Sequence, residues 1–150
     1  MILARVPKSR IRERSSYEFF VGRDAMNKPA WTADIGRRGA VLSNEGRCYR
    51  SAVSYDTGLN RYLWCQILPG GDPRFQGGFG IYDAPEPWGP WTTVYFTDAW
   101  DVGPGEMCSF PTKWMSADGK TVYLVSSGDD SFSVRRGVLE TSNDLGARKD

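Results

Sequence analysis

The segment that most constrains this chain is residues 78–95, GFGIYDAPEPWGPWTTVY, in which two apolar runs flank a corner rich in proline. Each proline of the corner fixes φ and lacks an N–H, so the corner can form neither a helix nor a central strand. Gly89 lets the backbone turn where a Cβ would clash. The sequence therefore predicts an ordered bend that holds Trp88 and Trp91 between two strands, at residues 80–82 and 92–95.

Length and charge narrow the class of protein further. The chain has 150 residues, of which 40% are hydrophobic, so it can bury the core of one domain or of part of a larger one. Its net charge is only +1, so we expect neither nucleic acid nor a membrane surface as a partner. A basic cluster near the start is typical of a solvated edge strand and loop; it consists of Arg5, Lys8, Arg10, Arg12 and Arg14.

The chain contains no histidine, which excludes Ser-His-Asp and Cys-His nucleophiles and the common histidine metal sites. Its three cysteines, Cys48, Cys65 and Cys108, lack the CxxC spacing of a structural zinc site. We therefore expect no metal and no cofactor, and any catalysis would rest on carboxylates, Tyr or Lys. The three cysteines could form one disulfide and leave one thiol free, and the sequence does not show which two would pair.

Strand and turn signals recur along the whole chain, and helix periodicity is nearly absent. The Gly-bearing loop at residues 56–60 predicts a hairpin that pairs Tyr55 with Tyr62. Both faces of that hairpin are partly apolar, which favours a sheet covered on both sides. The other predicted strands are residues 2–6, 17–22, 30–32, 113–116, 121–127 and 132–139, with one short strand possible at 40–42 and an irregular segment at 97–111.

A second hairpin is predicted around the Asp-Gly turn at residues 117–120. Pairing of Ser116 with Thr121 would place Trp114 opposite Tyr123. Aromatic strands at Tyr17, Tyr62 and Tyr123 recur at separations of 45 and 61 residues, near the period of four-stranded propeller blades with loops of variable length. We predict an all-β chain with about three sheets of a β-propeller, an open ring because propellers typically close with at least about four blades. Residues 1–139 would form this partial propeller, and residues 140–150 a polar tail.

Five segments in this order, YEFFVG, SAVSY, LNRYL, GIYDAPEPWGPWTTV and FPTKWMSADGKTVYLVSSG, resemble the C-terminal part of the family called domain of unknown function 4185. The resemblance covers roughly residues 2–139. It implies a five-bladed propeller related to a clan of glycoside hydrolases, in which some members are similar to endo-D-arabinanases. Such proteins are longer at the N-terminus and often exported, whereas this chain carries no signal peptide, so its location stays unknown.

Glycosidases need two carboxyl groups at the scissile bond, and an arabinan site would add aromatic platforms for sugar rings. In the irregular segment, Glu106 and Asp101 are our candidate catalytic acids. The candidate sugar-binding residues are Trp100, Trp88, Asp98 and Asp129. A purely structural role is the alternative for each, because acids also cap turns and a proline-bracketed tryptophan also packs between blades.

Two functions follow from this sequence. The first is a carbohydrate-active propeller, similar to hydrolases of arabinan-type polysaccharide, whose chain alone lacks a complete active site. The second is a non-catalytic propeller piece that binds a polysaccharide or oligosaccharide or interacts with other blades. Unpaired strand edges would favour self-association in either case.

Overall fold

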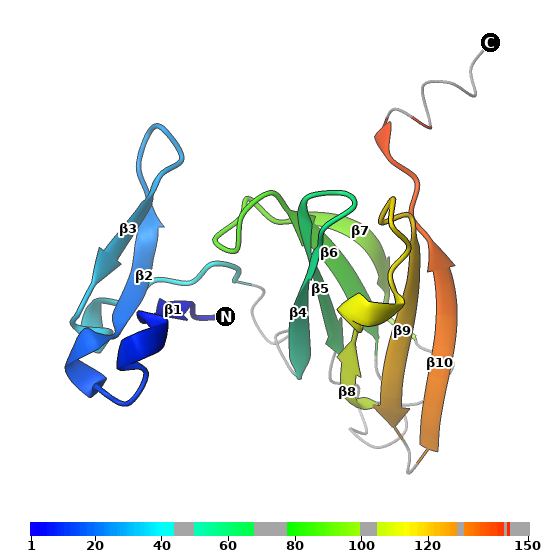
Figure 1. The fold of residues 1–150 in the computed structure, drawn as a ribbon, viewed down its shortest axis with the longest axis horizontal. Coiled ribbons are helices and arrows are strands. Elements are labelled where there is room, and N and C mark those ends of the chain that lie inside the picture. Colours follow the sequence, from blue (N-terminus) through cyan, green and yellow to red (C-terminus); the bar gives the residue numbers. More distant parts are fainter. Residues whose placement is uncertain (44–49, 68–77, 100–104, 129–130, 143, 145–150) are drawn as a thin grey trace.

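The computed structural model describes residues 1–43, 50–67, 78–99, 105–128, 131–142 and 144 (Figure 1). These residues form three antiparallel sheets, none of them closed, and short 3-10 turns. The prediction of an all-β chain with about three sheets is confirmed. No helix in the described part of the chain is both long and apolar enough to cross a membrane.

The first sheet has the order β1-β2-β3 and contains the N-terminal strands. Its strands are β1 (Ala4–Arg5), β2 (Glu18–Arg23) and β3 (Pro29–Thr32), and the turns around it are η1 (Lys8–Arg10), η2 (Arg14–Ser16) and η3 (Ile35–Arg37). Residues 40–42 are not a strand, but the N–H of Val41 donates to the carbonyl of Met1 at 3.0 Å. This segment therefore lies beside the start of the chain.

The second sheet is a meander in which each strand pairs with the next along the chain. Its strands are β4 (Ser51–Asp56), β5 (Arg61–Ile67), β6 (Phe79–Ala84) and β7 (Thr92–Thr97). Tyr55 pairs with Tyr62, which confirms the predicted register of the first hairpin. The proline-rich corner joins β6 to β7, and Gly89 within it has a φ of +90°, a conformation that favours glycine.

The third sheet has the order β10-β9-β8. Its strands are β8 (Gly105–Ser109), β9 (Thr121–Gly128) and β10 (Ser131–Val138), and the turn η4 (Thr112–Trp114) connects the first two. The predicted strand at 113–116 is wrong, because the chain folds there into a 3-10 turn with the N–H of Trp114 bonded to the carbonyl of Pro111. Trp114 still meets Tyr123 edge to face, at 6.4 Å between ring centroids.

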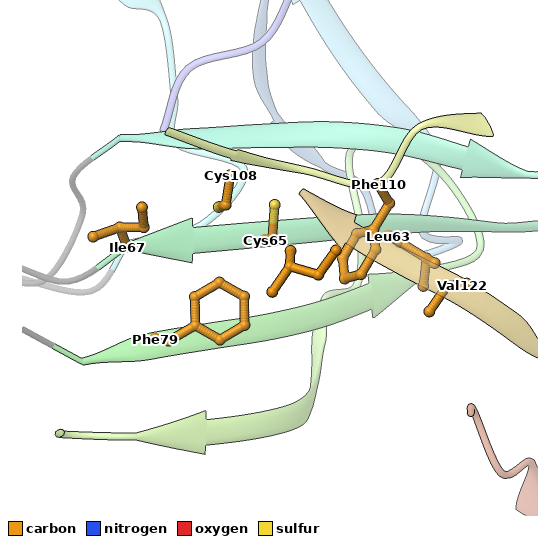
Figure 2. Close-up of a cluster of buried hydrophobic side chains, with 8 residues drawn as sticks. Leu63, Cys65, Ile67, Phe79, Cys108, Phe110 and Val122 are labelled. Carbon is orange, nitrogen blue, oxygen red and sulfur yellow. The ribbon is translucent and has the colours of Figure 1, made fainter. Parts of the chain in front are cut away.

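The main core lies between the second and third sheets (Figure 2). Alternate residues of β5 point toward the third sheet, and the side chains that pack there are Leu63, Cys65, Ile67, Phe79, Cys108, Phe110, Val122 and Leu124. The intervening residues of β5, Trp64 and Gln66, are also buried. Strand β5 is thus covered on both faces, as its two-sided apolar pattern predicts. Its hairpin partner β4 is not, because Val53 and Tyr55 are exposed, so the prediction of a sheet covered on both sides holds for only part of the hairpin.

The first and second sheets meet through aromatic side chains. The ring of Trp31 in β3 lies edge to face with Trp88 in the proline-rich corner, at 6.2 Å between centroids. The guanidinium of Arg5 lies 4.1 Å from the centroid of the Trp31 ring, within the range of a cation–π contact. The corner therefore connects two sheets as well as two strands.

Candidate functional site

The ends of several strands gather at one edge of the second and third sheets, the lower edge in Figure 1. In the second sheet, Phe79 at the start of β6 pairs with Ile67 on one side and with Thr97 on the other. In the third sheet, Gly105 at the start of β8 pairs with Gly128 at the end of β9. The chain therefore leaves the second sheet after Thr97 and enters the third at Gly105, both at this lower edge. The prediction of an irregular segment at 97–111 is wrong for residues 105–109, which form β8 because they pair with β9.

The structure places two of the candidate acids at the lower edge. Asp98 is exposed and follows directly on the last residue of β7. Glu106 is the second residue of β8, at a β-bulge between Gly105 and Met107. Bulges of this kind interrupt pairing and are frequent next to active sites. Three further candidates from the sequence, Trp100, Asp101 and Asp129, lie outside the described residues.

Trp88 lies at the opposite edge of the second sheet. The corner that carries it follows Ala84 and precedes Thr92, the ends of β6 and β7 that are farthest from Thr97. Its ring contacts Trp31 of the first sheet. The structure therefore does not bring Trp88 together with Asp98, and its described contact is with another side chain of the chain.

Sequence reasoning missed Gln66 as a candidate. This residue is next to the last residue of β5, at the lower edge, and its side chain is 0% exposed. Neither its amide nitrogen nor its amide oxygen has a hydrogen-bond partner among the described residues. Burial of an unpaired amide is costly, so a buried amide of this kind calls for a partner. The signal in the sequence was a polar residue in the apolar run of β5.

Gln66 shares its face of the sheet with a group of aromatic rings. The Trp64 ring lies 5.3 Å from the Tyr82 ring and 5.3 Å from the Trp91 ring, measured between centroids. The indole N–H groups of Trp64 and Trp91 also lack hydrogen-bond partners among the described residues. Trp91 therefore packs against the sheet, and this face combines aromatic surface with unpaired polar atoms.

A buried carboxylate stabilises the upper edge, which is the edge opposite Asp98 where the turns of the second and third sheets meet. Asp56 is completely buried, and its Oδ1 accepts hydrogen bonds from the N–H groups of Gly58 at 3.0 Å and Leu59 at 3.1 Å. A Cβ at Gly119 would lie 2.2 Å from the same oxygen, so the turns at 57–60 and 117–120 pack directly on one another. Asp56 thus caps one turn where the second sheet meets the third, a role that does not need a ligand.

One hollow lies beside the first sheet, away from the candidate acids. It has a volume of about 930 Å³ and is lined by Arg12, Arg14, Tyr17 and Asp34 among others. A second hollow, of about 540 Å³, separates β6 and β7 from β9 and β10 and is mostly apolar. In the described part of the chain, no three His, Cys, Asp or Glu side chains lie close enough to hold a metal.

Neither a known protein family nor a curated protein matches the sequence. The resemblance to domain of unknown function 4185 therefore stays a prediction.

Proposed function

We propose that this chain forms part of a carbohydrate-active β-propeller that binds arabinan-type polysaccharide at the lower edge of its sheets. The observation that carries this proposal is the position of Asp98 and Glu106, at the exit of β7 and the entry of β8. Carboxylates in loops over a rigid sheet scaffold are the usual equipment of a glycoside-binding or glycoside-cleaving site.

The relation between the second and third sheets supports a propeller arrangement. Their first strands, β4 and β8, are in contact with one another. Their later strands diverge, because a hollow lies between Val94 of β7 and the residues 135–139 at the end of β10. Adjacent propeller blades converge at the central axis and diverge outward in the same way. In such a ring, β4 and β8 would line the axis and the lower edge would face the ligand.

We expect this chain alone to show no hydrolysis. Cleavage needs an acid and a second carboxyl group held about 5 to 9.5 Å apart, and a propeller draws such groups from several blades. Three sheets would supply part of that ring. Loss of one positioned catalytic group commonly costs about two to four orders of magnitude in rate.

The test uses the purified chain and a synthetic arabinan. We expect saturable binding, measured by calorimetry, that Asp98→Asn weakens, and no detectable chain cleavage by reducing-end assay. Glu86→Gln is the matched control, because Glu86 is an exposed acid of the opposite edge. Absence of binding, or equal loss with Glu86→Gln, would contradict the proposed site. Endo-cleavage abolished by Glu106→Gln would instead show that the chain is a complete hydrolase with Glu106 as its acid.

The exposed face of β10 supports a second candidate function, an interaction module. Phe132 is 69% exposed, and Val134 and Val138 of the same strand are exposed as well. β10 is also an edge strand of its sheet, so its outer backbone groups are available for pairing. We expect the chain to self-associate in analytical ultracentrifugation and Phe132→Ser to reduce this. A stable monomer at high concentration would contradict the hypothesis that the chain is an interaction module.

A further inference from the structure

Two cysteines from different sheets meet in the core between the second and third sheets. Cys65 of β5 is 0% exposed, and Cys108 of β8 is 1% exposed. Both belong to one cluster of buried side chains, and both point into the space between their strands (Figure 2). A side-chain hydrogen bond with Cys65, together with burial, raises the pKa of Cys108 well above its ordinary value. Both cysteines are free thiols in the structure, and their strands, β5 and β8, are in contact.

We propose that Cys65 and Cys108 form a disulfide that joins the second sheet to the third when the chain folds under oxidising conditions. A disulfide needs Cα atoms within about 7 Å and Cβ atoms that face one another. Strands β5 and β8 are in contact and carry both thiols into the same core cluster, which brings the pair close to this requirement. This inference does not depend on the proposed carbohydrate function.

The oxidant would be a small-molecule disulfide such as glutathione disulfide. One cysteine, as its thiolate, attacks a sulfur of the oxidant, forms a mixed disulfide and releases one glutathione thiolate. The other cysteine then attacks the protein sulfur of the mixed disulfide and releases the second glutathione. The two cysteines lose two protons and two electrons in total, and the electrons reduce the oxidant to two thiols.

The bond should form during folding rather than afterwards. In the folded chain both sulfurs are buried, and the raised pKa of Cys108 keeps that thiol protonated. The thiolate is the attacking species, so a folded and reduced chain exchanges slowly. During folding both thiols are still accessible, and burial afterwards protects the bond from reductants. The pair is thus a permanent cross-link and not a reversible sensor.

The test is to refold the denatured, reduced chain in a glutathione redox buffer and to map its cysteines without reduction. Trypsin sites at Arg50, Arg61 and Arg74 put the three cysteines on separate peptides, so each pairing gives a distinct mass. We expect the Cys65 and Cys108 peptides to be linked and the Cys48 thiol to be free for alkylation. The cross-link should raise the Tm by on the order of 10 °C relative to the reduced chain.

Two variants separate the alternatives. Cys48→Ser should keep both the cross-link and the increase in Tm, and Cys108→Ala should lose both. If Cys108→Ala fails to fold, the peptide map and the Tm of Cys48→Ser in oxidised and reduced form decide the question. A linkage that includes Cys48, or three free thiols after oxidative refolding, would overturn the proposal. Oxidation of the folded, reduced chain as fast as during refolding would overturn its timing.

Discussion

The two faces of the second sheet are buried in different ways. The face toward the third sheet is lined by aliphatic and aromatic side chains such as Leu63 and Phe79, and by two thiols. The opposite face is lined by Trp64, Trp91 and Gln66. The side-chain nitrogen and oxygen atoms of these residues have no hydrogen-bond partners among the described residues. One face is thus a core in the ordinary sense, whereas the other buries groups that ordinarily require partners.

The two faces therefore contribute differently to the stability of the sheet. Apolar burial contributes about 25 cal/mol per Å² whatever the partner, so the face toward the third sheet needs only good packing. Unpaired amide and indole groups reduce the stability of the other face unless something bonds to them. The second face therefore buries polar groups for which the described residues supply no partners, and the first is a purely structural interface.

Removal of Phe79 would test the structural face and should give the largest effect. Phe79 is 1% exposed in the core between the sheets, and emptying such a site costs about 3–5 kcal/mol. We expect Phe79→Ala to lower the unfolding free energy by that amount in urea. Phe132→Ala is the matched control, because this phenylalanine is exposed on β10 and should change stability by less than about 0.5 kcal/mol. Equal midpoints for both variants would contradict the assignment of the core.

Removal of Trp91 would test the opposite face. Its ring packs on Trp64, and we expect Trp91→Ala to cost roughly 3 kcal/mol. The same variant should also weaken arabinan binding if this face belongs to the site. An unchanged urea midpoint would show that the ring carries no packing energy and would favour a role as an exposed sugar platform. Trp114→Ala is a suitable control, because that ring is half exposed on the third sheet.

The register of the first hairpin and the contact between Ser116 and Thr121 across the second turn were predictable, because local turn chemistry sets them. Asp-Gly at 118–119 and the Gly-bearing loop before Arg61 fix which residues face one another. Strand β8 was not predictable, because its sequence GEMCS has no β-branched residue and favours no strand. It forms because β9 offers hydrogen bonds and the core buries Cys108.

The candidate site was predictable only in part. The acids at 98 and 106 stand out because they occupy a polar segment between strong strands. The position of Trp88 depends on a contact with Trp31, far away in the sequence, which no local pattern encodes. The unpaired amide of Gln66 is likewise a property of the packed sheet, since its neighbours come from other segments.

Substitution at Gly119 would test the junction at the upper edge with a smaller effect. Gly119 has a φ of +73°, and a Cβ there would clash with Asp56 and Leu59 of the neighbouring turn. We expect Gly119→Ala to cost about 2 kcal/mol, measured by urea unfolding. Gly22→Ala is the control, because a Cβ at Gly22 meets nothing within 4 Å. If Gly22→Ala lost as much stability as Gly119→Ala, the packing of the two turns on one another would not explain the loss.

The smallest expected effect concerns the ion pair that ties the end of the chain to the third sheet. Lys120 Nζ lies 2.6 Å from Asp144 Oδ1, and Asp144 Oδ2 accepts hydrogen bonds from the N–H and hydroxyl of Thr141. The hydrogen bond from Lys120, and then those from Thr141, hold the pKa of Asp144 well below its ordinary value of 3.8. The hydrogen bond to Asp144 raises the pKa of Lys120 above 10.5.

The signs of these shifts define the pH range in which the tail is anchored. A lowered carboxyl pKa gives stability that is present above pH 3.8 and is lost as the pH falls through the folded value. A raised ammonium pKa gives stability that is present below pH 10.5 and is lost as the pH rises through the folded value. Because both side chains are partly exposed, salt should weaken the pair, and the unfolding midpoint should hardly move. The Thr141 amide resonance in NMR should therefore stay unchanged down through pH 3.8 and shift only in stronger acid. Asp144→Asn should remove that transition, whereas a Thr141 shift centred at pH 3.8 would mean that the ion pair does not form in solution.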